Sequence, residues 1–198
     1  MEQIIHQIWW QGVNHSIPRK YMQPHKSVLA FSSQHKIILH DKFSYTSLFE
    51  EHFPHLFSWF MSLESEICRC DIARLAIVYI YGGIYLDMDT YILKNLLPFF
   101  ELSKPFFSIT GYSEISEPFF CNSIFGAPKG SNLILNLINY LASTSLTPLN
   151  KSKDPDALTG PIPLSKFLNQ NRFYIHFAPP FADKSSFHNP SPFNVDKA

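Results

Sequence analysis

Residues 67–90 read ICRCDIARLAIVYIYGGIYLDMDT, and this stretch decides the fold. Apolar side chains at helical spacing predict a buried helix over 67–81, whose second half is apolar nearly all round. Gly82-Gly83 ends that helix, because glycine adopts positive φ angles at no steric cost. The run that follows, 84–87, is β-branched, aromatic and aliphatic, which predicts a buried strand of a parallel sheet. The whole stretch is therefore a helix, a turn, a strand and an acidic end.

Asp87 and Asp89 stand one residue apart at the exit of that strand. An unpaired carboxylate is costly to bury, whereas at a strand end it can reach a cation. Mg²⁺ and Mn²⁺ take oxygen ligands, commonly one or two carboxylates completed by water and phosphate. The doublet therefore predicts half of a metal-diphosphate site. A polar turn is the alternative, since Asp is a good turn former.

Asp71 and Arg74 lie three residues apart, so both project from one face of the predicted helix. The helix is otherwise too apolar to be a solvated surface. Two roles stay open for the pair: an ion pair that fixes the helix in place, or two side chains that hold a ligand.

Taken together, D-x-x-R at 71–74 and G-G-x-Y-x-D-x-D at 82–89 resemble the signature of glycosyltransferase family 32, the DXD-containing sugar-binding glycosyltransferases. More distantly they resemble the catalytic domains of the clostridial glucosylating toxins. The resemblance implies an α/β fold of the GT-A type, with a mostly parallel central sheet flanked by helices. It also implies metal-dependent transfer of a hexose from a nucleotide-diphosphate sugar, UDP- or GDP-linked, to an acceptor hydroxyl with retention of configuration.

The same resemblance implies roles for matching positions. Asp71 and Arg74 would hold the donor sugar and its phosphate, and Tyr85 would pack beside the nucleotide. Asp87 would contact the ribose and the metal, and Asp89 would bind Mn²⁺ or Mg²⁺ directly. The two helix residues and the two aspartates are the catalytic candidates.

Two adjacent tryptophans end the predicted first strand, 3–10, which reads QIIHQIWW. Ligands bind at such strand exits in open α/β sheets. Packing in the core is the alternative for both side chains, and it is the expectation for Trp10. The run IIHQIWWQG resembles the opening strand of the family, which implies that Trp9 stacks on the nucleotide base.

Two later positions are donor-binding or acceptor-binding candidates by resemblance. Asn122 occupies the place of an Asn near the acceptor or sugar, although a turn or ladder partner is the alternative. Thr159-Gly160-Pro161 resembles a T-G-P element of the family and would line the donor or acceptor pocket; a loop corner is the alternative.

The remaining pattern predicts a strand over 36–41 that ends at Asp41, which either lies near the base or caps a helix. An aromatic helical segment over 43–66 follows and is assigned to packing. Further expected elements are strands over 106–110 and 119–125 and a covering helix over 132–146.

The last part of the chain, about 180–198, departs from the family pattern. Family members commonly close the site with a C-terminal His and Trp segment, but all three Trp here lie in the first third of the chain. His188 and Asn189 are possible substitutes, and a flexible or incomplete tail is the alternative.

Composition bounds the class of protein. With 198 residues, 45% hydrophobic and 16% charged, the chain is expected to form one compact soluble domain. Sixteen basic and sixteen acidic residues leave no charge surplus to hold nucleic acid. The three cysteines show no C-x-x-C spacing and the nine histidines are dispersed, so we expect reduced thiols and no zinc site.

The N-terminus lacks a basic region before its apolar run, so no signal peptide is expected. The longest apolar run, 75–86, is short of the ~20 residues that cross a bilayer. These features predict a cytoplasmic enzyme, at most in peripheral contact with the inner face of a membrane. There it would act on a carbohydrate or lipid-linked acceptor in surface polysaccharide or glycolipid synthesis.

Two other classes of protein stay open. DMDT at 87–90 also fits the start of the haloacid-dehalogenase-like phosphatases, where the first Asp is a nucleophile. Those enzymes need a later acidic pair, for which only Asp154 and Asp156 are closely spaced. The third class is a catalytically silent sugar-nucleotide-binding module, which would use the same donor-binding residues.

Overall fold

The computed structural model describes residues 4–12, 14–31, 35–92, 103–113, 117–145, 154–171, 176–177 and 193–195. Six strands form a mixed central sheet in the order β2-β1-β3-β6-β5-β7. Their bounds are β1 Ile4–Ile8, β2 Lys36–His40, β3 Gly83–Leu86, β5 Phe106–Tyr112, β6 Pro118–Ala127 and β7 His176–Phe177. A separate pair joins β4 (Thr90–Ile92) to β8 (Phe193–Val195).

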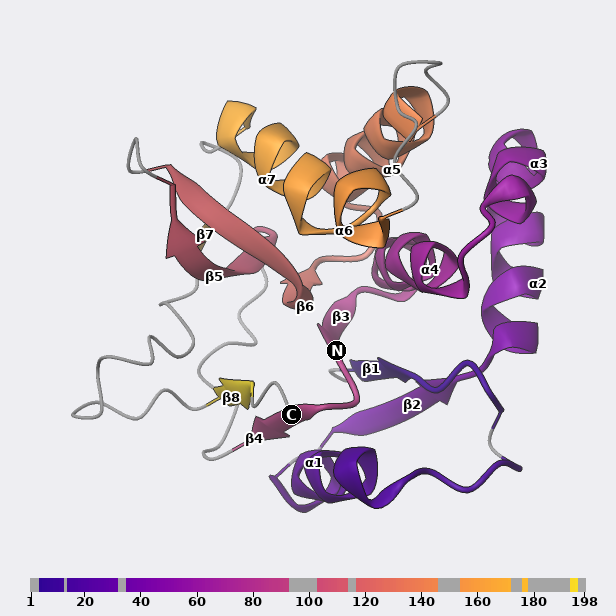
Figure 1. Cartoon of the computed structure of the whole chain (residues 1–198), viewed down its shortest axis with the longest axis vertical. Helices are drawn as coiled ribbons and strands as arrows, with labels where there is room; N and C mark the ends of the chain where they lie inside the picture. Colours follow the sequence, from indigo (N-terminus) through magenta and orange to yellow (C-terminus); the bar gives the residue numbers. More distant parts are fainter. Residues whose placement is uncertain are drawn as a thin grey trace.

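Three of the sheet's five pairings are parallel, and β6 runs antiparallel to both of its neighbours. The helices are α1 Arg19–Phe31, α2 Lys42–His52, α3 Pro54–Ser62, α4 Glu66–Tyr81, α5 Asn132–Ser145, α6 Pro155–Leu158 and α7 Pro161–Gln170. In Figure 1, α4 to α7 lie on one side of the sheet and α1 lies on the other, next to β4. The expected α/β fold with a central sheet flanked by helices is confirmed.

Each face of the sheet has its own apolar core. Along β3, Tyr85 packs with the larger cluster under α4, α5 and α7, while Ile84 and Leu86 pack with Val28 of α1. This alternation follows from the pleat, which points successive side chains to opposite faces. A side chain that follows β3 on the same face as Tyr85 can therefore reach α4.

The turn between α4 and β3 requires its two glycines. Gly82 and Gly83 have φ angles of 70° and 101°, and a Cβ on Gly83 would lie 2.3 Å from the carbonyl oxygen of Ile4. No other residue fits so close to β1 at positive φ. The expected helix, glycine turn and strand are present, with α4 beginning one residue earlier than predicted.

The aromatic segment 43–66 was expected to be helical, and this is confirmed as far as Ser62. The structure has two helices, α2 and α3, separated at Phe53. Pro54 causes the break, because proline has no N–H to continue a helix but is tolerated at the first helical position. Asp41 caps α2, where its Oδ1 accepts a 2.8 Å hydrogen bond from the backbone N of Ser44.

Strand β6 is irregular at the point where it passes the middle of α4. Phe107 of β5 pairs with Phe125, but the next residue, Ser108, pairs with Cys121. The extra residues between these pairs form a bulge, which changes the alternation of side chains. Asn122 thereby faces α4.

None of the helices in the described ranges combines the length and apolar character needed to span a bilayer. The C-terminal candidates His188 and Asn189 lie outside the described residues. The short strand β8, farther along, pairs with β4 directly after the acidic doublet.

Candidate functional site

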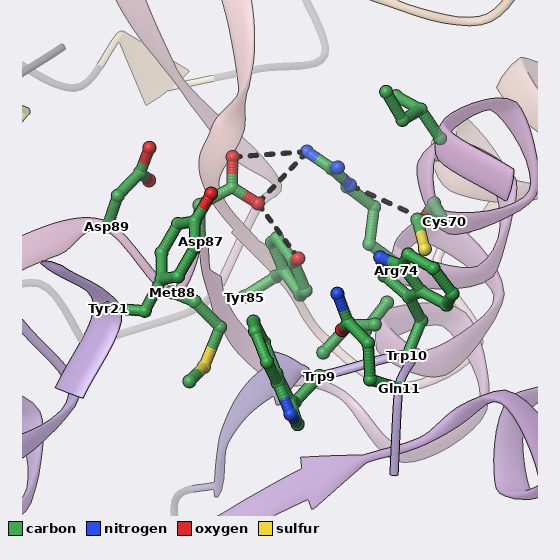
Figure 2. Close-up of a pocket in the computed structure, with 12 residues that line it drawn as sticks. Trp9, Trp10, Gln11, Tyr21, Cys70, Arg74, Tyr85, Asp87, Met88 and Asp89 are labelled. Carbon is green, nitrogen blue, oxygen red and sulfur yellow. Dashed lines mark hydrogen bonds and ion pairs between the residues drawn. The ribbon is translucent and has the colours of Figure 1, made fainter. Parts of the chain in front are cut away.

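The predicted site lies at the carboxyl ends of the neighbouring parallel strands β1 and β3. Trp9 follows β1, the doublet of Asp87 and Asp89 follows β3, and Arg74 reaches in from α4. These side chains line a cavity of about 230 Å³, together with Tyr21 from α1. Figure 2 shows them converging from separate elements of the chain. Such strand exits are where open α/β sheets bind ligands.

Arg74 links the helix to the acidic doublet. Its Nη1 lies 3.2 Å from Oδ1 of Asp87 and donates to the backbone oxygen of Asn122 at 3.0 Å, and its Nη2 lies 3.1 Å from Oδ1 of Asp71. Burial alone would lower the pKa of Arg74, but the charges of Asp87 and Asp71 keep that pKa above its ordinary value. Arg74 therefore stays charged, and it contacts the ring face of Tyr85 at 4.9 Å.

Asp71 is enclosed by protein groups and does not line the cavity. Asn122 Nδ2 donates to its Oδ1 and Thr159 Oγ1 donates to its Oδ2, both at 2.9 Å. Burial raises the pKa of Asp71, against the opposing effects of Arg74 and these two donors. In this conformation Asp71 reaches the cavity only through Arg74. The structure thus brings together Asp71, Arg74, Asn122 and Thr159, which come from three distant parts of the sequence.

Tyr85 and Asp87 form the wall of the cavity on the β3 side. The hydroxyl of Tyr85 donates to Oδ1 of Asp87 at 2.9 Å, and the backbone N of Asp87 donates to the oxygen of Ser123 in the β6 bulge, also at 2.9 Å. Burial raises the pKa of Asp87 to about 6 in spite of Arg74, and the charge of Asp89 adds to the rise. The Asp87 side chain nevertheless keeps 28% of its surface exposed to the cavity side.

The doublet fits a divalent cation by the chemistry of its donors. Asp89 is half-buried and makes no hydrogen bond or ion pair with another described residue, and Figure 2 shows its carboxylate without a partner. Two carboxylates match what Mg²⁺ or Mn²⁺ takes from a protein when phosphate supplies further oxygens. A cation would also offset the repulsion between the two aspartates. Within the described ranges, no group of three or more His, Cys, Asp and Glu could hold a metal.

The two tryptophans have different environments. Trp9 is 7% exposed, packs against Tyr21 with ring centroids 5.5 Å apart, and has an enclosed Nε1 with no partner among the described residues. Trp10 was expected in the core, but it is 41% exposed. It belongs to the turn of residues 10–12 after β1, and the apolar core ends at the preceding strand. Both side chains line the cavity.

Gly160 serves the site indirectly. It begins α7, and a Cβ there would lie 2.8 Å from Cα of Asp156. The tight corner fixes the preceding Thr159, which is 1% exposed and holds Asp71. Gly160 itself does not line the cavity.

Gln7, which contacts the backbone of the acidic doublet, was not predicted from the sequence. Gln7 of β1 is fully buried, its Nε2 donates to the backbone oxygen of Asp87 at 3.4 Å, and its Oε1 lies 2.6 Å from Nδ1 of His25 on α1. The strand period was the available signal, because Gln7 shares a sheet face with Ile5 and a buried amide there needs partners. Tyr21 was also missed, since nothing near it in the sequence marks a site.

The class of protein follows from comparison with known families. Residues 18–106 match the family described as a glycosyltransferase sugar-binding region containing a DXD motif. This range includes α1, the Asp71 and Arg74 pair and the acidic doublet. The resemblance predicted from the sequence is confirmed, since this part of the chain is similar to DXD-containing sugar-binding regions.

Two curated relatives are similar to this chain. "Inositol phosphoceramide mannosyltransferase 3" of Schizosaccharomyces pombe is 29% identical over 138 residues, which are 70% of this chain and 36% of the relative. "Uncharacterized glycosyltransferase L373" of Acanthamoeba polyphaga mimivirus is 36% identical over 110 residues, which are 55% of this chain and 42% of the relative. The chain thus spans about two fifths of the length of these relatives.

Solved structures share the fold. The PaToxG glycosyltransferase has a TM-score of 0.63 at 17% identity, with 86% of this chain and 69% of that chain covered. The catalytic domain of alpha-toxin from Clostridium novyi has a TM-score of 0.56 at 12% identity, with 88% and 73% covered. The distant likeness to clostridial toxin domains is therefore confirmed at the level of the fold.

Proposed function

We propose that this chain transfers a hexose from a nucleotide-diphosphate sugar to an acceptor hydroxyl. The observation that supports this most is the contact of Arg74 with Asp87 at the edge of a cavity walled by Trp9. A cation, an acidic doublet and an aromatic face are the groups that a diphosphate, its metal and a base require.

Each side chain has a role in this proposal. Trp9 stacks on the base and Tyr85 packs beside the nucleotide. Arg74 donates to the phosphate or the sugar from the edge of the cavity, and Asp71 holds Arg74 in that orientation. Asn122 and Thr159 keep Asp71 fixed. When bound by Asp87 and Asp89, Mn²⁺ or Mg²⁺ neutralises charge on the departing diphosphate.

The reaction is proposed to retain the anomeric configuration. The oxygen of the acceptor forms a bond to the anomeric carbon as the bond from that carbon to the diphosphate oxygen breaks, and the acceptor proton passes to the departing phosphate. The free carboxylate of the cavity, Asp89, is assigned to the metal, so it is not available to form a glycosyl-enzyme. Asp87 is held by Arg74 and Tyr85, and burial raises the pKa of the Cys70 thiol to about 11.

The acceptor is proposed to be a carbohydrate or a lipid-linked saccharide, in surface polysaccharide or glycolipid synthesis. One relative is named as a mannosyltransferase of inositol phosphoceramide, which supports a hexose donor and a glycolipid acceptor. We place the reaction in the cytoplasm, with peripheral contact at the inner face of a membrane.

A silent sugar-nucleotide-binding module is the second candidate, because binding uses the same residues as transfer.

The phosphatase hypothesis has less support. Of the later acidic pair that it needs, Asp154 accepts a hydrogen bond from the backbone N of Asp156 and caps the short helix α6. In a phosphatase of this kind, Asp71 and Arg74 would have no role in the reaction.

A thermal shift panel tests the proposal. UDP- and GDP-linked hexoses are added with and without Mn²⁺, and the melting temperature is measured. We expect one donor to stabilise the protein only when the metal is present. Release of free sugar from that donor then separates an enzyme from a silent module, and no stabilisation by any donor would contradict both.

A further inference from the structure

A second cavity lies beside the donor pocket and has no role in the proposed donor binding. It has a volume of about 460 Å³ and is formed by the turn after β1 and the start of α2. Trp10 and Gln11 line both cavities, so this turn is the partition between them. A group in the second cavity would therefore lie next to a donor in the first.

The most exposed hydrophobic side chains in the walls of the second cavity are aromatic. Phe43 is 81% exposed and Trp10 is 41% exposed, although an aromatic side chain gains most from burial. Two of the polar side chains there have partners. Asp41 caps α2, and Lys42 Nζ forms an ion pair with Oε2 of Glu66 at 2.5 Å. The cavity thus has exposed aromatic surface beside a carboxylate that caps a helix and an ammonium group that is paired with Glu66.

The partition itself carries an unused hydrogen-bond acceptor. Oε1 of Gln11 is enclosed and has no hydrogen-bond partner among the described residues. Enclosed polar atoms are rarely left unpaired, and each unpaired one costs free energy. A rotation of the Gln11 side chain would present this atom to a hydroxyl group of a ligand between the two cavities.

We infer that this second cavity is the acceptor subsite and binds the apolar aglycone of an amphiphilic glycoside. The aglycone packs between Phe43 and Trp10, and the sugar lies at Gln11 with a hydroxyl facing the donor pocket. This inference rests on the proposed function. A bilayer surface would not need a hollow, and a peptide would need partners for a row of backbone groups, whereas Oε1 of Gln11 is the one enclosed unpaired side-chain atom among the described residues that line this cavity.

The test uses n-butyl, n-hexyl and n-octyl glucoside below their critical micelle concentrations, with binding measured by calorimetry. We expect the affinity of the natural protein to rise by about twofold to fourfold for each added methylene. Phe43→Ser should remove this dependence on chain length. Ile162→Ser is the matched control, since Ile162 is 51% exposed on α7, far from α2 in Figure 1.

Gln11→Leu separates the two parts of the subsite. It should weaken all three glucosides by a similar factor and keep the dependence on chain length. An affinity that does not rise with chain length, or that rises equally in Phe43→Ser, would overturn the inference. So would binding to phosphatidylcholine vesicles, or self-association, that depends on Phe43 while the monomeric glucosides do not bind.

Donor binding distinguishes this inference from the proposed function. Stabilisation by nucleotide sugar and Mn²⁺ should be the same in Phe43→Ser as in the natural protein, because Phe43 does not line the donor pocket. If no donor stabilises either protein but the glucosides bind as expected, the proposed function fails, and the cavity remains a glycoside-binding site without the role of an acceptor subsite.

Discussion

The guanidinium of Arg74 lies 3.2 Å from the carboxylate of Asp87, across thirteen positions of the sequence. Between them the chain leaves α4, turns at two glycines and passes through β3. The contact therefore ties the helix to the exit of the strand. It also places a fixed positive charge at the edge of a cavity whose lining includes two carboxylates and several aromatic rings.

Arg74→Ala should lose both stability and donor binding. Its removal leaves Asp71 and Asp87 without their shared cation, and breaking a buried charge pair costs about 3–5 kcal/mol. We expect a fall of this size in the free energy of unfolding, measured by urea titration. Arg74→Lys keeps the charge but cannot reach both carboxylates with a planar group. We therefore expect it to lose less stability than Arg74→Ala, but to bind the donor more weakly than the natural protein. If Arg74→Lys bound the donor as tightly as the natural protein does, a role of Arg74 as the bridge between Asp71 and Asp87 would be contradicted.

Thr159→Val should lower both stability and donor affinity, through the loss of its hydrogen bond to Asp71. The substitution keeps the volume but leaves Oδ2 of Asp71 without its donor, which costs about 1–3 kcal/mol. Thr159→Ser keeps the hydroxyl and is the control. We expect lower unfolding free energy and weaker donor binding by calorimetry for the Val variant. A Val variant that matches the Ser variant in both measurements would rule out support of Asp71 by Thr159.

Two buried histidines should make stability depend on pH. His6 Nδ1 lies 3.1 Å from Nε2 of His40, and His6 Nε2 lies 2.9 Å from the oxygen of Gly82. Burial lowers the pKa of His6 to about 3 and that of His40 to about 4, with Asp41 opposing the latter shift. Tyr81 stacks on both rings. Both histidines are therefore neutral in the folded protein at neutral pH.

The sign of this effect follows from proton binding. An unfolded histidine takes up a proton below pH 6.5, while the folded pair stays neutral until about pH 4. The contribution to stability is thus fully present above pH 6.5 and is lost as the pH falls toward 4. Each histidine contributes up to about 1.4 kcal/mol per pH unit. Urea unfolding of the natural protein and His40→Gln at pH 7 and pH 5 should show a smaller pH effect in the variant; equal effects would contradict neutral burial.

The local pattern of 67–90 was sufficient to predict the centre of the fold. Helix α4, the glycine turn and β3 each follow from a property of a short stretch: helical periodicity, positive φ and β-branched content. Pro54, at which the helical aromatic segment divides into α2 and α3, was visible in the sequence as well.

The rest of the site depends on contacts between distant parts of the chain. Asn122 faces α4 because of a bulge in β6, which the alternation of its side chains does not reveal. Thr159 meets Asp71 across 88 positions, and only the family resemblance pointed to it. The exposure of Trp10 depends on where the strand ends, which sequence patterns locate least well.

The most direct test of the central claim is the effect of Asp89→Asn on metal-dependent donor binding. Asp89 makes no hydrogen bond or ion pair with other described residues, so the variant should fold with unchanged stability, as should the exposed control Glu51→Gln. Calorimetry with the stabilising nucleotide sugar is performed with and without Mn²⁺. We expect the natural protein and Glu51→Gln to bind the donor much more tightly with Mn²⁺, and Asp89→Asn to show no gain from the metal. A full gain from Mn²⁺ in Asp89→Asn would contradict the account.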